Sequence, residues 1–197
     1  MNKVFEVELL KLKERLTKMF FLAEEQVENA FKATLADDSV NNELVKKIEK
    51  KADKLELKTE KLTQNIFALS QPVASDLRFI IGANSISNEL ERICDLAYDI
   101  IKHSNYMNAD KALLENIGFA GIKPDFIIIL NKVHEVFINQ NDELSYRVIK
   151  ELNDFEIRIY GIIENNENIL PFNQNSFSFI YRLILVVHSL ARITKHY

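Results

Sequence analysis

Acidic side chains recur at helical spacing between residues 91 and 99. Glu91, Asp95 and Asp99 follow one another every four residues, so on a helix they share one face and span roughly 12 Å of its axis. The apolar residues of the same segment lie nearly opposite: Leu90, Ile93, Ala97 and Ile100. We therefore expect the carboxylates on the surface of the protein, outside its core.

A second acidic series precedes the first and consists of Glu49, Asp53, Glu56 and Glu60, with the lysines of that segment in a different sector. If the two segments form an antiparallel hairpin that turns at Gln71, Asp53 lies level with Glu91, and Glu49 lies level with Asp95. The hairpin thus predicts that four carboxylates converge.

Converging carboxylates repel one another and raise their own pKa values, and a bound cation removes that penalty. Oxygen ligands without a neighbouring cysteine ligand favour Mg, Mn, Fe or Ca over structural zinc. The alternative is a solvated acidic face that pairs incidentally with lysines and Arg92, which is the commoner arrangement in an arbitrary helical hairpin.

Other reactive residues give weaker patterns. No histidine has a glutamate three residues before it, which argues against a ferritin-like di-iron bundle. Cys94 lies between two of the acidic residues and is either a redox sensor or an inert small side chain, the second being usual for a lone cysteine. Neither a glycine-rich phosphate loop nor a serine nucleophile elbow can be assembled.

Asp76, Arg78 and Arg92 are candidates for contact with a partner or with phosphate. Asp76 also has an ordinary role, because an aspartate in a first helical turn complements the helix dipole.

The elements that position these residues are helices. Apolar residues recur at three and four spacing over residues 4–35, 44–69 and 72–100. Three further helices are predicted to begin near Pro124, near Asp142, and near Pro171 or Ser176. With only 4 Gly and 3 Pro among 197 residues, the chain suits an all-α fold of six long helices.

The two halves align with each other when the sequence is shifted by 100 residues. The shift pairs Phe79 with Phe179, Leu90 with Leu190 and Arg92 with Arg192. The sequence therefore predicts two three-helix repeats, one over residues 1–107 and one over residues 108–197, with a chance match between helical patterns as the alternative.

Composition limits the classes of partner. The net charge of -4 gives no general field that attracts nucleic acid or an anionic membrane. The apolar segment 177–190 contains Arg182 and His188 and is shorter than a membrane span. A single cysteine and no amino-terminal apolar segment fit the reducing cytoplasm.

Two strings resemble the signature of the PhoU family of phosphate-uptake regulators: Gln71-Pro-Val-Ala-Ser-Asp-Leu-Arg78 and Leu90-Glu-Arg-Ile-Cys-Asp95. The resemblance is close in the first half and holds only in outline in the second. It implies two tandem three-helix bundles, spectrin-like in architecture, in a cytoplasmic and often homodimeric protein. It also implies two partners, the ATPase subunit of a phosphate ABC transporter and a phosphate-sensing histidine kinase.

The resemblance further implies a multinuclear metal cluster held by acid-x-x-x-acid motifs on the bundle surface, with Fe, Mn, Mg or Zn as its ions. By position the motif residues are Glu91 and Asp95 on one helix and Glu49 and Asp53 on the other. Asp99 stands where the family commonly has asparagine, and Cys94 replaces a usual glycine.

The second repeat departs from this pattern. The 100-residue shift places Ile149, Asn153, Ala191 and Lys195 under the four acidic positions of the first repeat. A second acidic site is therefore not expected.

Three functions are consistent with these features. A non-enzymatic regulator of phosphate transport and signalling is the leading one. A helical adapter of another pathway that kept only the fold is the alternative. A metal-dependent hydrolase at Glu91 and Asp95 is the least favoured, because no separate nucleophile or general base is visible.

Overall fold

The fold is all-α, as the sequence predicts. The structure, a computed structural model, describes residues 3–35, 40–69, 72–105, 111–139, 141–168 and 177–196. Within these ranges it contains α1 (Lys3–Thr34), α2 (Asn42–Leu69), α3 (Ala74–Asn105), α4 (Lys111–Asn116), α5 (Ile122–Asn139), α6 (Asp142–Glu164) and α7 (Phe177–His196). None of these helices combines the length and apolar character that a bilayer span requires.

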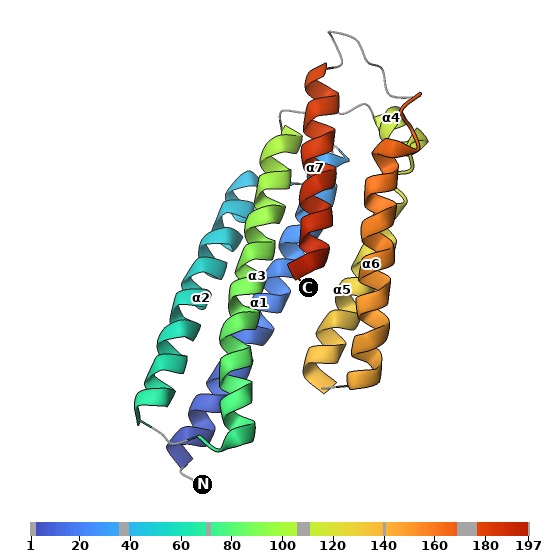
Figure 1. The fold of residues 1–197 in the computed structure, drawn as a ribbon. Helices are drawn as coiled ribbons and strands as arrows, with labels where there is room; N and C mark the ends of the chain where they lie inside the picture. The colour runs from blue at the N-terminus through green and yellow to red at the C-terminus, as the bar shows by residue number, and fades with distance from the viewer. Residues whose placement is uncertain are drawn as a thin grey trace.

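Helices α1, α2 and α3 run up, down and up as a three-helix bundle (Figure 1). One face of α1 is fully buried because its apolar residues recur at three and four spacing; these include Leu12, Leu16, Met19, Ala23, Val27 and Ala30. Polar contacts fix the upper end of the bundle. The Thr34 and Ser104 hydroxyls lie 2.9 Å apart, and Gln26 Nε2 donates a hydrogen bond to the Val45 carbonyl.

Helix α4 was not among the six predicted helices. Its six residues are too few to show a helical period, and it ends in a turn at Gly118. There φ is +78°, a conformation that glycine adopts without strain. Hydrogen bonds from the Gly118 and Phe119 amides to carbonyls of Glu115 and Leu114 close the turn.

The remaining helices agree closely with the predicted boundaries. Pro124 lies in the first turn of α5, two residues after its start, where proline is tolerated. The Asn141 side chain caps α6 by accepting a hydrogen bond from the Leu144 amide. The described part of α7 begins at Phe177, while Pro171 and Ser176 lie outside the described residues.

The two halves share one hydrophobic core. Its main cluster contains buried residues from all seven helices, and α7 packs along the upper part of α3 (Figure 1). Aromatic rings connect the halves directly: Phe31 of α1 meets Phe126 of α5 edge to face at 5.8 Å between centroids. The predicted boundary at residues 107 and 108 lies outside the described residues.

A polar pair, the buried His134 and the half-buried Glu24, also joins the halves. His134 of α5 is 8% exposed, and its Nδ1 lies 3.2 Å from Glu24 Oε1 on α1. The imidazole stacks on Phe20 at 5.2 Å and meets the edge of Phe21 at 4.9 Å. Its Nε2 atom is buried without a hydrogen-bond partner in the described part of the chain.

Candidate metal centre

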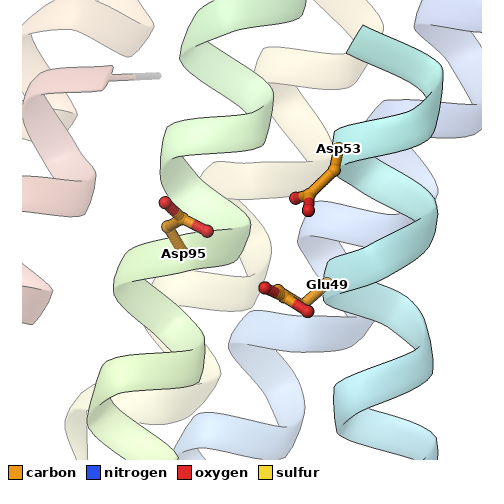
Figure 2. Close-up of side chains that lie close together, drawn as sticks. All are labelled: Glu49, Asp53 and Asp95. Carbon is orange, nitrogen blue, oxygen red and sulfur yellow. The ribbon is translucent and has the colours of Figure 1, made fainter. Parts of the chain in front are cut away.

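Three carboxylates from two helices form the centre of the candidate site. Glu49 and Asp53 of α2 and Asp95 of α3 each place one oxygen so that the three oxygens lie within 4.8 Å of one another (Figure 2). All three side chains are half-buried. No other group of three or more potential ligands of this kind lies among the described residues.

Helical periodicity accounts for this convergence. Glu49 and Asp53 are four residues apart, so they leave α2 on one side. Ile48 and Ala52, one position earlier in each case, are 1% exposed and hold α2 against the core. On α3, Asp95 lies between the buried Cys94 and Leu96, at the edge of the apolar face. The acidic stripes therefore meet beside the core, along the line where α2 and α3 pack.

Glu91 and Glu56 extend the site toward the lower end of the hairpin. Burial, followed by the charges of Asp95, Glu56 and Asp53, raises the pKa of Glu91 to about 7. Burial and the neighbouring carboxylates, Glu60 first, also raise the pKa of Glu56. Glu56 was placed in the acidic stripe but not among the predicted ligands; its spacing of three residues from Asp53 was the available signal.

The central carboxylates are themselves held against ionisation. Burial raises the pKa of Glu49, and the negative charges of Asp53 and Asp95 raise it further. Burial, followed by the negative charge of Asp53, raises the pKa of Asp95. A hydrogen bond with Glu91 and the positive charge of Arg92 act in the opposite direction and reduce this rise. The site thus concentrates negative charge that its cationic neighbours offset only in part, and a bound cation would offset it further.

Asp99 stands apart from this group. It is exposed, and its carboxylate forms an ion pair with Lys102 at 2.7 Å. It contributes no oxygen to the set of three. The sequence placed Asp53 level with Glu91 and Glu49 level with Asp95. In the structure Asp53 also lies close to Asp95, so the register of the hairpin differs in detail from the predicted one.

The residues proposed for partner contact occupy two places. Arg92 is half-buried beside Asp95 and favours its ionised form. Asp76 and Arg78 lie in the first turns of α3, about 28 Å and about 25 Å along the helix axis from Asp95. Asp76 lines a surface depression of about 360 Å³ with Glu6, Lys13 and Phe79 among its other walls.

Cys94 is structural. It is 1% exposed, and burial followed by the adjacent carboxylates raises the pKa of its thiol. A reactive cysteine needs the opposite, an exposed thiol with a lowered pKa. The redox-sensor alternative therefore has no support from its surroundings.

The second repeat has no equivalent acidic group in the part of the chain that the structure describes. Lys195 stands at the position of Asp95 and forms an ion pair with Glu156 of α6 at 2.9 Å. Ala191, at the position of Glu91, is fully buried. The substitutions seen in the sequence thus replace a carboxylate pocket by a salt bridge and core packing.

Known proteins match both the sequence and the fold. A family model described as the PhoU domain matches residues 16–103, which include all the predicted ligands. A relative from Archaeoglobus fulgidus is 31% identical over 67% of this chain and 74% of its own length. One from Clostridium acetobutylicum is 27% identical over 98% of this chain and 88% of its own. Both are named phosphate-specific transport system accessory protein PhoU homolog.

A solved structure has the same fold. The crystal structure of PhoU from Pseudomonas aeruginosa aligns with a TM-score of 0.83 and covers 98% of this chain and 92% of its own. The two sequences are 23% identical over the alignment, so this likeness establishes the architecture of the helices and nothing more.

Proposed function

The chain belongs to the PhoU family, and on that premise we propose that it regulates phosphate uptake and phosphate-starvation signalling from the cytoplasm. It acts through protein contact and not as an enzyme. The names of its relatives, which are accessory proteins of phosphate-specific transport, support the phosphate role. The partners we propose are the ATPase subunit of a phosphate ABC transporter and a phosphate-sensing histidine kinase.

The observation that carries the regulatory part of the proposal is the group formed by Glu49, Asp53 and Asp95. These residues would hold a metal ion, and Glu91 would complete the donor set. All the donors are carboxylate oxygens, which suit Mg, Mn, Fe or Ca. A bound cation supplies positive charge at a point where the carboxyls otherwise resist ionisation. It would thereby change the charge of the surface that α2 and α3 present to a partner.

Metal binding is tested on its own by elemental analysis of purified protein. Asp95→Asn should lose most of the metal, because Asp95 is the only member of the three that lies on α3. Asp99→Asn is the matched control, an exposed acid four residues away that pairs with Lys102. Equal metal content in Asp95→Asn and the parent would remove the site as proposed.

The partner is tested by affinity capture with the purified ATPase subunit and the kinase of the same organism. Binding to either, and its weakening in Asp95→Asn but not in Asp99→Asn, is the expected result. Failure to bind both under phosphate-rich conditions would contradict the phosphate role.

A helical adapter of another pathway is the second candidate. The absence of acidic residues at Ile149, Asn153, Ala191 and Lys195 favours it. The second repeat therefore lacks the acidic motif that the first repeat carries. Derepression of phosphate-starvation genes on deletion of the gene supports the first candidate; unchanged expression supports the second.

A further inference from the structure

Three surface depressions join into one groove along the lower part of the molecule. The depression beside Asp76, of about 360 Å³, shares Lys13 and Phe79 with a second one of about 370 Å³. The second depression shares Ile86 and Phe137 with a third of about 300 Å³. The three therefore form a continuous channel on the surface, here termed the α3 groove.

The α3 groove has the length of a short helix. It extends along α3 from Ser75 to Leu90, which is about 22 Å, or the length of an α-helix of about 15 residues. Its other walls come from α1 and from the carboxyl-terminal end of α5, so both halves of the chain contribute. Apolar side chains at its edges remain open to solvent: Leu10 is 59% exposed and Ile138 is 60% exposed.

The groove continues the side of α3 that a helix covers higher up. Seven-residue steps from Gly82 lead to Glu89, Leu96 and His103, and residues at this spacing stay on one side of a helix. Leu96 is 2% exposed, and His103 lies near Arg182 of α7. In Figure 1, α7 packs along the upper part of α3 and its described part ends beside the middle of that helix. The same side of α3 is thus covered by α7 above and open below.

Gly82 keeps the middle of the groove open. It lies inside α3, where a glycine weakens the helix relative to alanine, and it lines the second depression. A Cβ built on it would meet no atom within 4 Å, so packing within the described part of the chain does not require a glycine there. A glycine allows another backbone to approach closely. This favours an occupant with a backbone of its own, such as a helix.

The charges along the groove define the chemistry of that occupant. Glu6 and Asp76 line the lower depression. Lys13 lies where the lower and middle depressions join, with its Nζ 5.4 Å from the centroid of the Phe79 ring. Neither Lys13 nor the two carboxylates form an ion pair with a described residue. A carboxylate beside Lys13 and a cation beside Glu6 and Asp76 would therefore complement all three.

We propose that the α3 groove binds an amphipathic helix of a partner protein. The helix places apolar residues at three and four spacing against the groove, an acidic residue beside Lys13, and a basic residue at the end that meets Glu6 and Asp76. Docking of a helix in an apolar groove is a common mode of recognition. The proposal rests on the proposed function in one respect, action through protein contact. It adds a second contact surface, separate from the metal centre between α2 and α3.

The first test uses a synthetic peptide of about 15 residues, capped at both ends, as the probe. The peptide carries leucines at three and four spacing, glutamates in its middle turns and lysines in its end turns. Titrated into nitrogen-15-labelled protein, it should cause saturable shifts in the amide signals of residues 75–90 and 133–138. A peptide of the same composition with its leucines spread around the helix is the matched control. It should bind at least about tenfold more weakly.

Gly82→Leu should block the groove without disturbing the core. The added side chain enters space that no other atom occupies, so the protein should stay folded while its affinity for the peptide falls at least about tenfold. Asn88→Leu is the matched control, because Asn88 is an exposed residue of α3 outside the three depressions. Its affinity should equal that of the parent. Thermal unfolding verifies that both variants are folded.

A charge exchange tests the position of the acidic residue. Lys13→Glu should weaken binding of the peptide with central glutamates and should strengthen binding of a second peptide with central lysines. A purely structural role of Lys13 would not reverse this preference. Lys18→Glu is the matched control on α1, since Lys18 is exposed and lies outside the three depressions. It should leave the preference of the parent unchanged.

Affinity capture with the purified ATPase subunit and kinase separates this proposal from the proposed function. Gly82→Leu should lose the partner that the parent captures, and Asn88→Leu should keep it. A parent that binds the peptide but captures neither protein contradicts the proposed function and leaves the groove as a helix-binding site. A partner captured equally by the parent and by Gly82→Leu supports the proposed function and overturns the groove as its docking surface.

Three further results would overturn the proposal. The first is the absence of saturable shifts at a peptide concentration of about 1 mM. The second is equal binding of the peptide to the parent and to Gly82→Leu, which places the binding site elsewhere. The third is self-association of the parent that Gly82→Leu abolishes, because the occupant is then a second copy of this chain. Sedimentation velocity of both proteins measures the last.

Discussion

At the scale of single residues, Glu91 is the carboxyl that responds most to its surroundings. Its pKa rises to about 7 because the side chain is half-buried and faces Asp95, Glu56 and Asp53. The charged form is therefore disfavoured in the folded protein relative to the unfolded chain. Cation binding needs ionised carboxylates, so we expect the affinity for metal to rise with pH through about 7.

This shift predicts the pH dependence of stability in the metal-free protein. The folded state keeps the Glu91 proton up to about pH 7, whereas the unfolded chain releases it near pH 4.5. The contribution of Glu91 to the free energy of unfolding should therefore be greatest below pH 4.5 and should be lost as pH rises to about 7. Thermal unfolding in the presence of a chelator, at pH 5 and pH 8, measures this decline.

Glu91→Gln should reduce the decline, because the amide cannot ionise. Asp99→Asn is the control and should keep the parental slope, since Asp99 is exposed and paired with Lys102. Identical pH profiles for the parent and Glu91→Gln would show that Glu91 does not carry the effect. Saturating metal should also flatten the parental profile, because it stabilises the ionised folded state.

At the scale of helices, two glycines have opposite roles. Gly118 follows α4 with φ of +78°, which strains any residue with a Cβ, although no atom lies within 4 Å of the added carbon. Gly118→Ala should destabilise the protein by about 1 kcal/mol.

Gly82 is inside α3, also with no atom within 4 Å, so Gly82→Ala should stabilise the protein by about 0.5–1 kcal/mol. Urea unfolding measures both, and changes of the same sign would refute the backbone explanation.

The contact between α1 and α5 includes the pair of the half-buried Glu24 and the buried His134. Burial raises the pKa of Glu24, and the charge of His134 and its hydrogen bond to the carboxylate reduce this rise. Glu24→Ala leaves the imidazole buried without its carboxylate and should destabilise the protein by about 1–3 kcal/mol. Replacing both members, as Glu24→Leu with His134→Phe, should recover most of the loss. A double variant no more stable than Glu24→Ala, as judged by urea midpoints, would contradict this account.

At the scale of the whole molecule, the two predicted repeats share one core. Phe155 of α6 is 1% exposed and stacks on Phe126 of α5 at 4.6 Å; Phe126 in turn meets Phe31 of α1. The aromatic contacts therefore run from the outer helix of the second half to the first helix of the chain. This continuity predicts a single cooperative unfolding transition.

Phe155→Ala tests that continuity. It should lower the free energy of unfolding by about 3–5 kcal/mol and should weaken hydrogen-exchange protection in α1 and α3 as well as in α5 and α6. Val148→Ala, a smaller buried deletion in α6, should have the same distribution of effects with a smaller amplitude. Loss of protection confined to residues 122–196 would show that the halves unfold as separate domains.

The helices that position the site could be predicted because their signals are local. Apolar residues at three and four spacing predicted α1, α2 and α3, and the starts of α5 and α6 were predicted near Pro124 and near Asp142. Helix α4 escaped detection because six residues show no period; tertiary burial of Leu114, Ile117 and Phe119 holds that segment in place. The acidic stripe on each helix was equally local, since spacing alone decides which side chains share a face.

Which acids meet was decided by the packing of α2 against α3. The sequence determines that Glu49 and Asp53 share one face and that Glu91, Asp95 and Asp99 share another. Only the tertiary structure selects Glu49, Asp53 and Asp95 as the closest group and leaves Asp99 with Lys102. The reason is physical: helical period fixes directions around an axis, whereas the distance between two axes and their relative rotation depend on core side chains far apart in the sequence.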